Sequence, residues 1–213
     1  MIFFIPAYDD ATRANLGVIM PVIPQNSIQL LEQNATRANL WQHLSTNNLL
    51  FAMAHGDSDA IWDNNEIRRA LALMDNTHFI DKKSCVFACF TANELGLHLK
   101  MHNSIYWGYT GSIAASTHSE LLTPIFASIF QHIITFFPNC DDKQAINTSI
   151  HKLKLLCDNA QNEVDTLYEM NDDIDVMSSY NCLNHIWNRL RVHHFAHKQV
   201  IQHPESQIGD LFE

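Results

Sequence analysis

Two short apolar runs, each ending in a chemically reactive side chain, constrain the fold of this chain most strongly. Residues 49–54 (LLFAMA) precede His55 and Gly56, and residues 85–88 (CVFA) precede Cys89. Their short length and their aromatic and β-branched content are typical of strands buried on both faces. The 29 residues from Gly56 to Ser84 leave room for a crossover, so the two strands are predicted to run parallel.

Parallel pairing would bring His55 and Cys89 to one edge of a sheet. Neighbouring strands lie about 4.8 Å apart, so side chains at their carboxyl ends can converge on one substrate. A thiol with an ordinary pKa of about 8.5 needs a nearby imidazole to form a thiolate, and that imidazole can later protonate a departing amine. The alternative is an inert buried thiol and a histidine that merely ends a strand. A chain with 13 histidines and 5 cysteines contains many histidine-cysteine pairs, so one such pair is weak evidence by itself.

The rest of the pattern predicts an α/β fold with a mainly parallel central sheet flanked by helices. We expect strands at 2–8, at 21–24 or 28–31, and at 49–54, 84–89 and 104–109, alternating with helices at 10–18, 35–45, 64–75 and 93–102; helices at 119–137, 142–170 and 179–199 follow. The helix at 64–75 is the expected crossover, since Ala70, Leu71 and Met74 have helical spacing.

A hexapeptide, ATRANL, occurs at residues 11–16 and again at 35–40. Asp10 and Asn34 precede the two copies and are predicted to cap two similar helix starts. The sequences beyond the hexapeptide diverge, so we do not interpret it as a duplicated domain.

Composition narrows the classes of partner and compartment. A formal net charge of -10 argues against binding nucleic acid or an anionic membrane, which needs clustered Lys and Arg. Five cysteines, an odd number without a CxxC pair, favour a reducing compartment. The first residues lack a signal-peptide pattern, and the apolar stretch at 121–137 is interrupted by polar residues and shorter than the ~20 residues of a membrane span. We therefore expect a cytoplasmic protein.

These motifs resemble the caspase-like cysteine peptidases, most closely their CHAT-type branch. The segments ATRANLWQHLSTNNLLFAMAHGD, SCVFACFTA and SIYWGYTGS follow the family's order: a helix starting at Ala-Thr, a strand ending in His-Gly, a strand ending in Ala-Cys-x-Thr, and an apolar strand ending near Gly108. The resemblance covers residues 28–155. It implies a caspase-like sandwich, with a peptidase domain at 1–170 and a C-terminal helical appendage with a loose tail at 171–213.

The resemblance also implies roles for individual residues. Cys89 would be the nucleophile and His55 the base, a catalytic dyad without a third member or a cofactor. The backbone N–H groups of Gly56 and Cys89 would form the oxyanion hole, and the missing Cβ of Gly56 would let the substrate carbonyl approach. The family usually has glycine where this chain has Ala92. If that position needs a positive φ, alanine would strain it by about 1 kcal/mol or more, which favours an inactive caspase-fold adaptor as the alternative.

Substrate contacts are expected from carboxylates near this edge. Asp9 and Asp10 follow the first strand and Asp57 follows His-Gly, so they could favour Arg or Lys before the cut through charge-assisted hydrogen bonds. The alternative for each is a solvated loop or a helix cap. Tyr109, which ends the last apolar strand, is a further candidate for the wall of the site.

A metal site is the remaining alternative. Cys85 and Cys89 with His98 or His102 could imitate a zinc set, but structural zinc ligands usually come from loops and not from a buried strand. We expect no metal. The closely spaced His193 and His197 are expected on a surface helix.

The function expected from the residues and the resemblance is a cysteine endopeptidase that cleaves a protein substrate. We expect a regulated processing enzyme, controlled by an activating partner protein or by proteolysis. The CHAT-type resemblance further implies a role in a bacterial stress or antiviral defence system. An inactive adaptor or a metal-binding structural protein stays open as an alternative.

Overall fold

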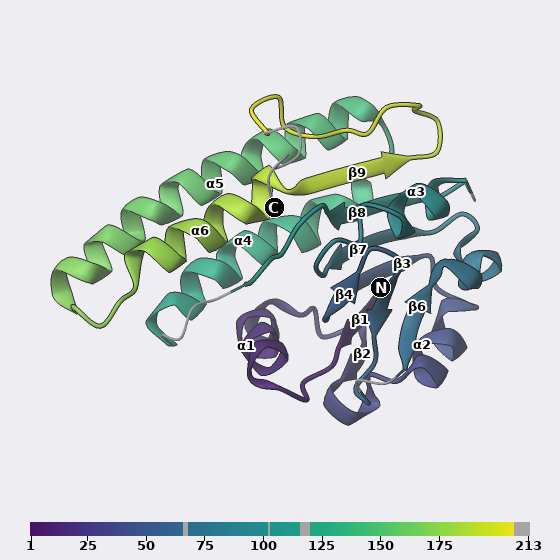
Figure 1. Cartoon of the computed structure of the whole chain (residues 1–213), viewed down its shortest axis with the longest axis horizontal. Helices are drawn as coiled ribbons and strands as arrows, with labels where there is room; N and C mark the ends of the chain where they lie inside the picture. The colour runs from purple at the N-terminus through teal and green to yellow at the C-terminus, as the bar shows by residue number, and fades with distance from the viewer. Residues whose placement is uncertain (66–67, 102, 116–119, 207–213) are drawn as a thin grey trace.

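The computed structural model describes residues 1–65, 68–101, 103–115 and 120–206. Its centre is a six-stranded sheet with the order β2-β1-β3-β7-β8-β9 (Figure 1). The strands are β1 (Ile2–Ile5), β2 (Ile28–Leu31), β3 (Leu49–Met53), β7 (Lys83–Phe87), β8 (Ile105–Tyr109) and β9 (Leu190–His194). The first five run parallel and β9 runs antiparallel to β8. The predicted α/β fold with a mainly parallel sheet is thus confirmed.

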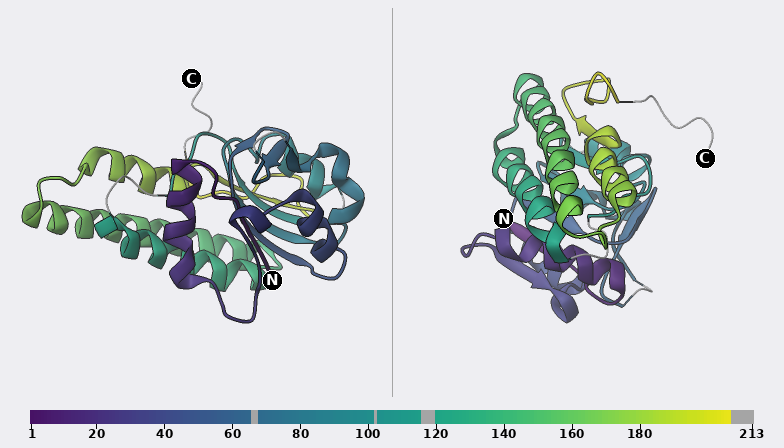
Figure 2. Two further views of the ribbon diagram at one scale, coloured as in Figure 1. Left: turned by 90° about the horizontal axis from the view of Figure 1, so that it is seen from below. Right: turned by 90° about the vertical axis from the view of Figure 1, so that its left-hand side faces the viewer.

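Both faces of the sheet are buried, as the continuous apolar runs predict. Phe3 and Ile5 of β1 belong to one hydrophobic core, whereas Ile2 and Phe4 of the same strand belong to the other. The first core is shared with α1 (Asp10–Ile19), α4 (Thr123–Phe136), α5 (Lys143–Met170) and α6 (Val176–Asn188), and the second with α2 (Arg37–Leu44) and α3 (Leu95–Lys100). Figures 1 and 2 show α4, α5 and α6 lying side by side and projecting beyond the sheet.

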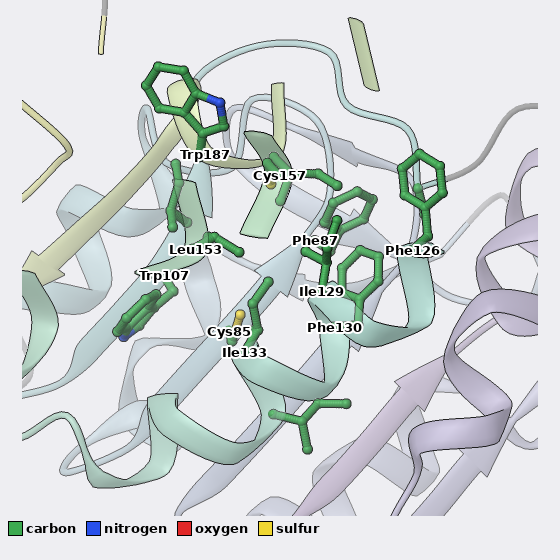
Figure 3. Close-up of a cluster of buried hydrophobic side chains, with 14 of the residues drawn as sticks. Cys85, Phe87, Trp107, Phe126, Ile129, Phe130, Ile133, Leu153, Cys157 and Trp187 are labelled. Carbon is green, nitrogen blue, oxygen red and sulfur yellow. The ribbon is translucent and has the colours of Figure 1, made fainter. Parts of the chain in front are cut away.

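The larger core is built on aromatic contacts with α4 (Figure 3). The ring of Phe87 packs edge-on against Phe130, with centroids 4.9 Å apart, and against Tyr109 at 5.2 Å. Among the described residues, the stretch Glu120–Asn139 has the length and apolar character of a membrane-crossing helix. Here 56% of its most apolar window is buried inside the protein, where Phe130 packs against Phe51 and Phe87 of the sheet and α4 packs against α5.

The crossover from β3 to β7 differs from the prediction. Instead of a helix at 64–75, the described chain forms β4 (Gly56–Asp57), β5 (Ala60–Trp62) and β6 (Arg69–Ala72), paired antiparallel, and then the 3-10 segment η3 (Leu73–Phe79). Ala70 and Leu71 are buried as neighbours in a strand and not along a helix stripe. A tertiary contact fixes this geometry, because the buried Asp75 carboxylate accepts hydrogen bonds from Ala72 N–H at 2.8 Å and from the two terminal guanidinium nitrogens, Nη1 and Nη2, of Arg37.

The C-terminal segment also differs. The predicted helix at 179–199 ends at Asn188, and β9 then pairs with β8, so the segment 171–213 is not only a helical appendage but supplies a strand of the central sheet. The reason is that β8 would otherwise be an unpaired edge strand. His193 is therefore buried in a strand and does not lie on a surface helix. The start of the predicted loose tail is packed, since His203 lies 5.3 Å from Trp187, ring to ring; residues 207–213 are outside the described part.

His193 links β9 to the turn after Cys89. Its Nε2–H donates to the Ala92 carbonyl at 2.8 Å, and its ring fills the space beside Gly96, where a Cβ would lie 2.6 Å from His193 Cδ2. Burial of the ring lowers the pKa of His193 to about 4. The imidazole is therefore neutral in the folded protein near neutral pH.

This burial predicts a loss of stability in mild acid. Between pH of about 6.5 and 4 the unfolded chain binds a proton at His193 and the folded chain does not. The neutral imidazole therefore contributes fully to the free energy of unfolding above the unfolded pKa, and this contribution, about 3 kcal/mol in total, is lost as pH falls through the folded pKa. Urea unfolding of the wild type and His193→Gln across this range should show a slope against pH that is about one proton smaller in the variant. Parallel curves would contradict the assignment.

Candidate active site

The carboxyl ends of β1, β3 and β7 meet at one edge of the sheet. β3 pairs with β7 in a register that places Met53 opposite Phe87, and His55 and Cys89 each follow two residues later. Side chains alternate along a strand, so both continue the face that carries Met53 and Phe87. The strand order reverses between β1 and β3, which is where open α/β sheets form their ligand crevice.

A cavity of about 590 Å³ lies at this edge and contains both predicted residues. Its described lining comes from α1, the ends of β3 and β7, the loop after β8 and the start of α4: Asp10, Ala11, Ala14, Asn15, Gly17, Ala54, His55, Phe87, Cys89, Ile113, Ala114, Ala115, Glu120 and Thr123. The structure therefore brings His55 and Cys89 together at one opening.

Cys89 has the surroundings of an accessible thiol. It is half-buried, and its Sγ accepts a hydrogen bond from Ile113 N–H at 3.4 Å, which would stabilise a thiolate. Burial raises the pKa of the thiols of Cys85, Cys140 and Cys157, and it raises that of Cys182 to about 11. These four thiols are held in the protonated, unreactive form.

His55 is hydrogen-bonded to Asp9, a residue that the sequence predicted as a substrate contact. Its Nε2–H donates to Asp9 Oδ2 at 2.7 Å, so Nδ1 is left as a proton acceptor. Asp9 also caps α1, because Oδ1 accepts from Thr12 N–H at 2.8 Å and from the Thr12 hydroxyl at 2.6 Å. Asp9 and Thr36, and not Asp10 and Asn34, are the observed N-caps.

The contacts of Asp9 keep it ionised. Partial burial alone would raise the pKa of its carboxyl, but the hydrogen bonds from Thr12 and from His55 outweigh this, so the pKa of Asp9 is lowered. A charged carboxylate fixes both the ring orientation and the tautomer of His55. No third residue beside Cys89 and His55 was predicted from the sequence, although the position of Asp9 after the first strand indicated that its carboxylate could reach the same edge of the sheet.

In this resting arrangement Cys89 and His55 have separate partners. Among the described residues, no hydrogen bond joins Cys89 Sγ to the imidazole; the sulfur contacts the backbone of Ile113 and the ring contacts Asp9. Hydrogen bonds between a nucleophile and its base are often long before substrate binds and tighten in the complex. Proton transfer between the two groups therefore requires them to move closer to each other.

Glycine at position 56 is required by packing. A Cβ there would lie 2.8 Å from both Ala88 Cβ and Thr91 Cγ2, and 3.0 Å from the Cys89 carbonyl oxygen. The missing side chain thus lets the His-Gly turn approach the turn after β7. This space holds the protein's own chain, which differs from the predicted space for a substrate carbonyl.

The backbone strain after the cysteine lies at Phe90. Phe90 has φ of 61°, whereas Ala92 is not among the non-glycine residues with positive φ. Ala92 is buried and its N–H donates to the Tyr109 carbonyl at 2.9 Å. The predicted strain at Ala92 is wrong, and this argument for an inactive protein is removed.

The other predicted contacts are distributed differently. Tyr109 is fully buried in the core, so its prediction as a wall of the site is wrong. Asp10 lies at the cavity rim, exposed and paired with Arg13 at 2.8 Å, and Asp57 is exposed on β4 and does not line the described cavity. Cys85 lies in the core (Figure 3), and His102 is outside the described residues. No group of three or more potential metal ligands occurs within the described ranges.

No family model, curated protein sequence or solved structure matches this chain significantly. Any functional assignment therefore depends on the residues and the geometry of this cavity.

The close packing at position 56 gives a stability prediction. Gly56→Ala should lower the free energy of unfolding by about 1–3 kcal/mol, because neighbouring backbone and side chains must move apart. Gly17→Ala is the matched control: a Cβ at Gly17 meets nothing within 4 Å, and removing a helix glycine should raise stability by about 0.5–1 kcal/mol. Urea unfolding measures both, and equal effects of the two substitutions would contradict the packing argument.

Proposed function

We propose that this protein is a cysteine endopeptidase with Cys89 as nucleophile, His55 as base and Asp9 as the residue that positions His55. The observation that carries the proposal is the cavity at the ends of β3 and β7. In this cavity the Cys89 thiol accepts a hydrogen bond from a backbone N–H group, and the imidazole of His55, which lines the same cavity, is hydrogen-bonded to the Asp9 carboxylate. The motif resemblance to caspase-like peptidases of the CHAT type supports the same assignment.

The proposed reaction is acyl transfer in two steps. His55 Nδ1 takes the proton of Cys89, and the thiolate attacks the carbonyl carbon of the scissile bond. The resulting oxyanion would be stabilised by backbone N–H groups of Gly56 and Cys89, and collapse of the intermediate expels the amine, which takes the proton from His55. Water, deprotonated by His55, then hydrolyses the thioester and releases the free thiol.

The biological setting is part of the proposal. The substrate would be a protein, cleaved in the cytoplasm as a regulated processing step within a bacterial stress or antiviral defence system. Control by an activating partner would act on the approach of His55 to Cys89, because these two groups are not hydrogen-bonded at rest. The same observation favours the alternative of a catalytically inactive adaptor.

Thiol labelling tests the assignment without a known substrate. Iodoacetamide should alkylate Cys89 before the other cysteines, and His55→Ala should slow the Cys89 reaction at least about tenfold. Mass spectrometry locates the label, Cys89→Ala serves as the blank, and a mixed peptide library reports cleavage. Labelling of Cys89 that does not depend on His55, with no cleavage, would favour the adaptor.

Asp9→Asn tests the positioning role. An amide can donate or accept a hydrogen bond, so it can also hold the tautomer of His55 whose proton is on Nδ1. We therefore expect kcat/KM to fall about tenfold or more and the pH profile of labelling to change. Thr12→Val is the control, because it removes the hydrogen bonds that the Thr12 hydroxyl makes with Asp9 in the α1 cap and keeps the Asp9 to His55 contact. A similar loss in both variants would show that Asp9 acts only through the helix cap.

A further inference from the structure

We infer, on the basis of the proposed function, that the cavity selects a long apolar side chain, such as Leu, Met or Phe, at the residue before the cut. The inference replaces the expectation of a basic residue at this position. It rests on the shape of the cavity, the vacant space at Gly17 and the placement of charge around the opening.

Small residues form the α1 side of the cavity. Ala11, Ala14 and Gly17 recur every third residue on α1, so they share one face of the helix, and all three line the cavity. Ala54 at the end of β3 and Ala114 and Ala115 after β8 add to them, so six of the fourteen described lining residues are alanine or glycine. The space beside Cys89 is therefore wide enough for a bulky side chain.

Gly17 shows that this space is not needed for packing. A Cβ added there meets no atom within 4 Å, so an alanine would fit without any clash. Glycine within a helix destabilises it relative to alanine. The vacancy at Gly17 thus enlarges the cavity at a cost to α1.

Charge around the cavity disfavours a basic side chain. A buried Arg or Lys head group needs a carboxylate partner inside the pocket. Asp9 is bonded to His55 and Thr12, Asp10 is exposed and paired with Arg13, and Glu120 is exposed at the rim. The described interior offers no buried carboxylate that could receive such a head group.

An acidic side chain is disfavoured for the opposite reason. The described lining contains no Lys or Arg, while Asp10 and Glu120 stand at the rim and would repel a carboxylate. Phe87 and Ile113 instead provide apolar contact surface close to Cys89. An apolar side chain gains from burial here without leaving a charge unpaired.

Peptidyl chloromethyl ketones that differ only in the residue next to the ketone test the inference. The Cys89 thiolate displaces chloride from the methylene carbon, and mass spectrometry measures the rate of label at Cys89. With the full chain, probes carrying Leu, Met or Phe should react about 10–100 times faster than the Ala probe, and probes carrying Arg or Asp no faster than Ala. Preference for Arg or Asp would overturn the inference.

The series Gly17→Ala and Gly17→Leu tests where the preference arises. The ratio of the Leu rate to the Ala rate should fall progressively as the side chain at position 17 fills the cavity. Thermal melting verifies that both variants fold, and an unchanged ratio in folded Gly17→Leu would overturn the inference.

Iodoacetamide separates this inference from the proposed function. Labelling of Cys89 that depends on His55, without any preference for apolar probes, overturns the inference alone. If neither reagent labels Cys89 in a manner that depends on His55, the peptidase proposal and the inference both fail.

Discussion

The parallel pairing of β3 with β7 is the constraint on which the rest of the structure depends. The register places Met53 opposite Phe87, so the two reactive residues leave their strands at matching depth and on the same face. A slip of one residue would turn one of the two side chains to the opposite face of the sheet. Burial of both faces holds the register, since each core takes alternate residues of these strands.

A single carboxylate joins the start of a helix to the candidate base. Asp9 uses one oxygen for the Thr12 cap and the other for His55. Negative charge is favourable at the positive end of α1, so the same group suits both tasks. The orientation of His55 is thereby coupled to the folding of the first β-α unit.

The floor of the cavity is continuous with the hydrophobic core. Phe87 lines the cavity and also packs edge-on against Phe130 of α4. The opening is therefore supported by close-packed side chains and not by a loop alone. The glycine at position 56 and the positive φ of Phe90 let the two strand ends turn away from the sheet in close contact.

Local sequence patterns were sufficient for elements whose apolar residues follow the expected spacing and also lie in the core. The strands that end before His55 and Cys89 are such elements, and their prediction held. The crossover at 64–75 failed because Ala70 and Leu71 fit either a helix stripe or a short strand, and the distant Arg37 decides between them through Asp75. The helix predicted through His193 failed because the free edge of β8 determines the conformation there.

The amino-acid sequence by itself determined the α/β class, the parallel pair of strands and the presence of a histidine and a cysteine at their ends, because these follow from apolar runs and spacing. Only the tertiary structure decided that Asp9 holds His55, that Tyr109 is buried and that small residues of α1 open a cavity beside Cys89. These properties depend on contacts between segments far apart in the chain, for which no local periodicity exists.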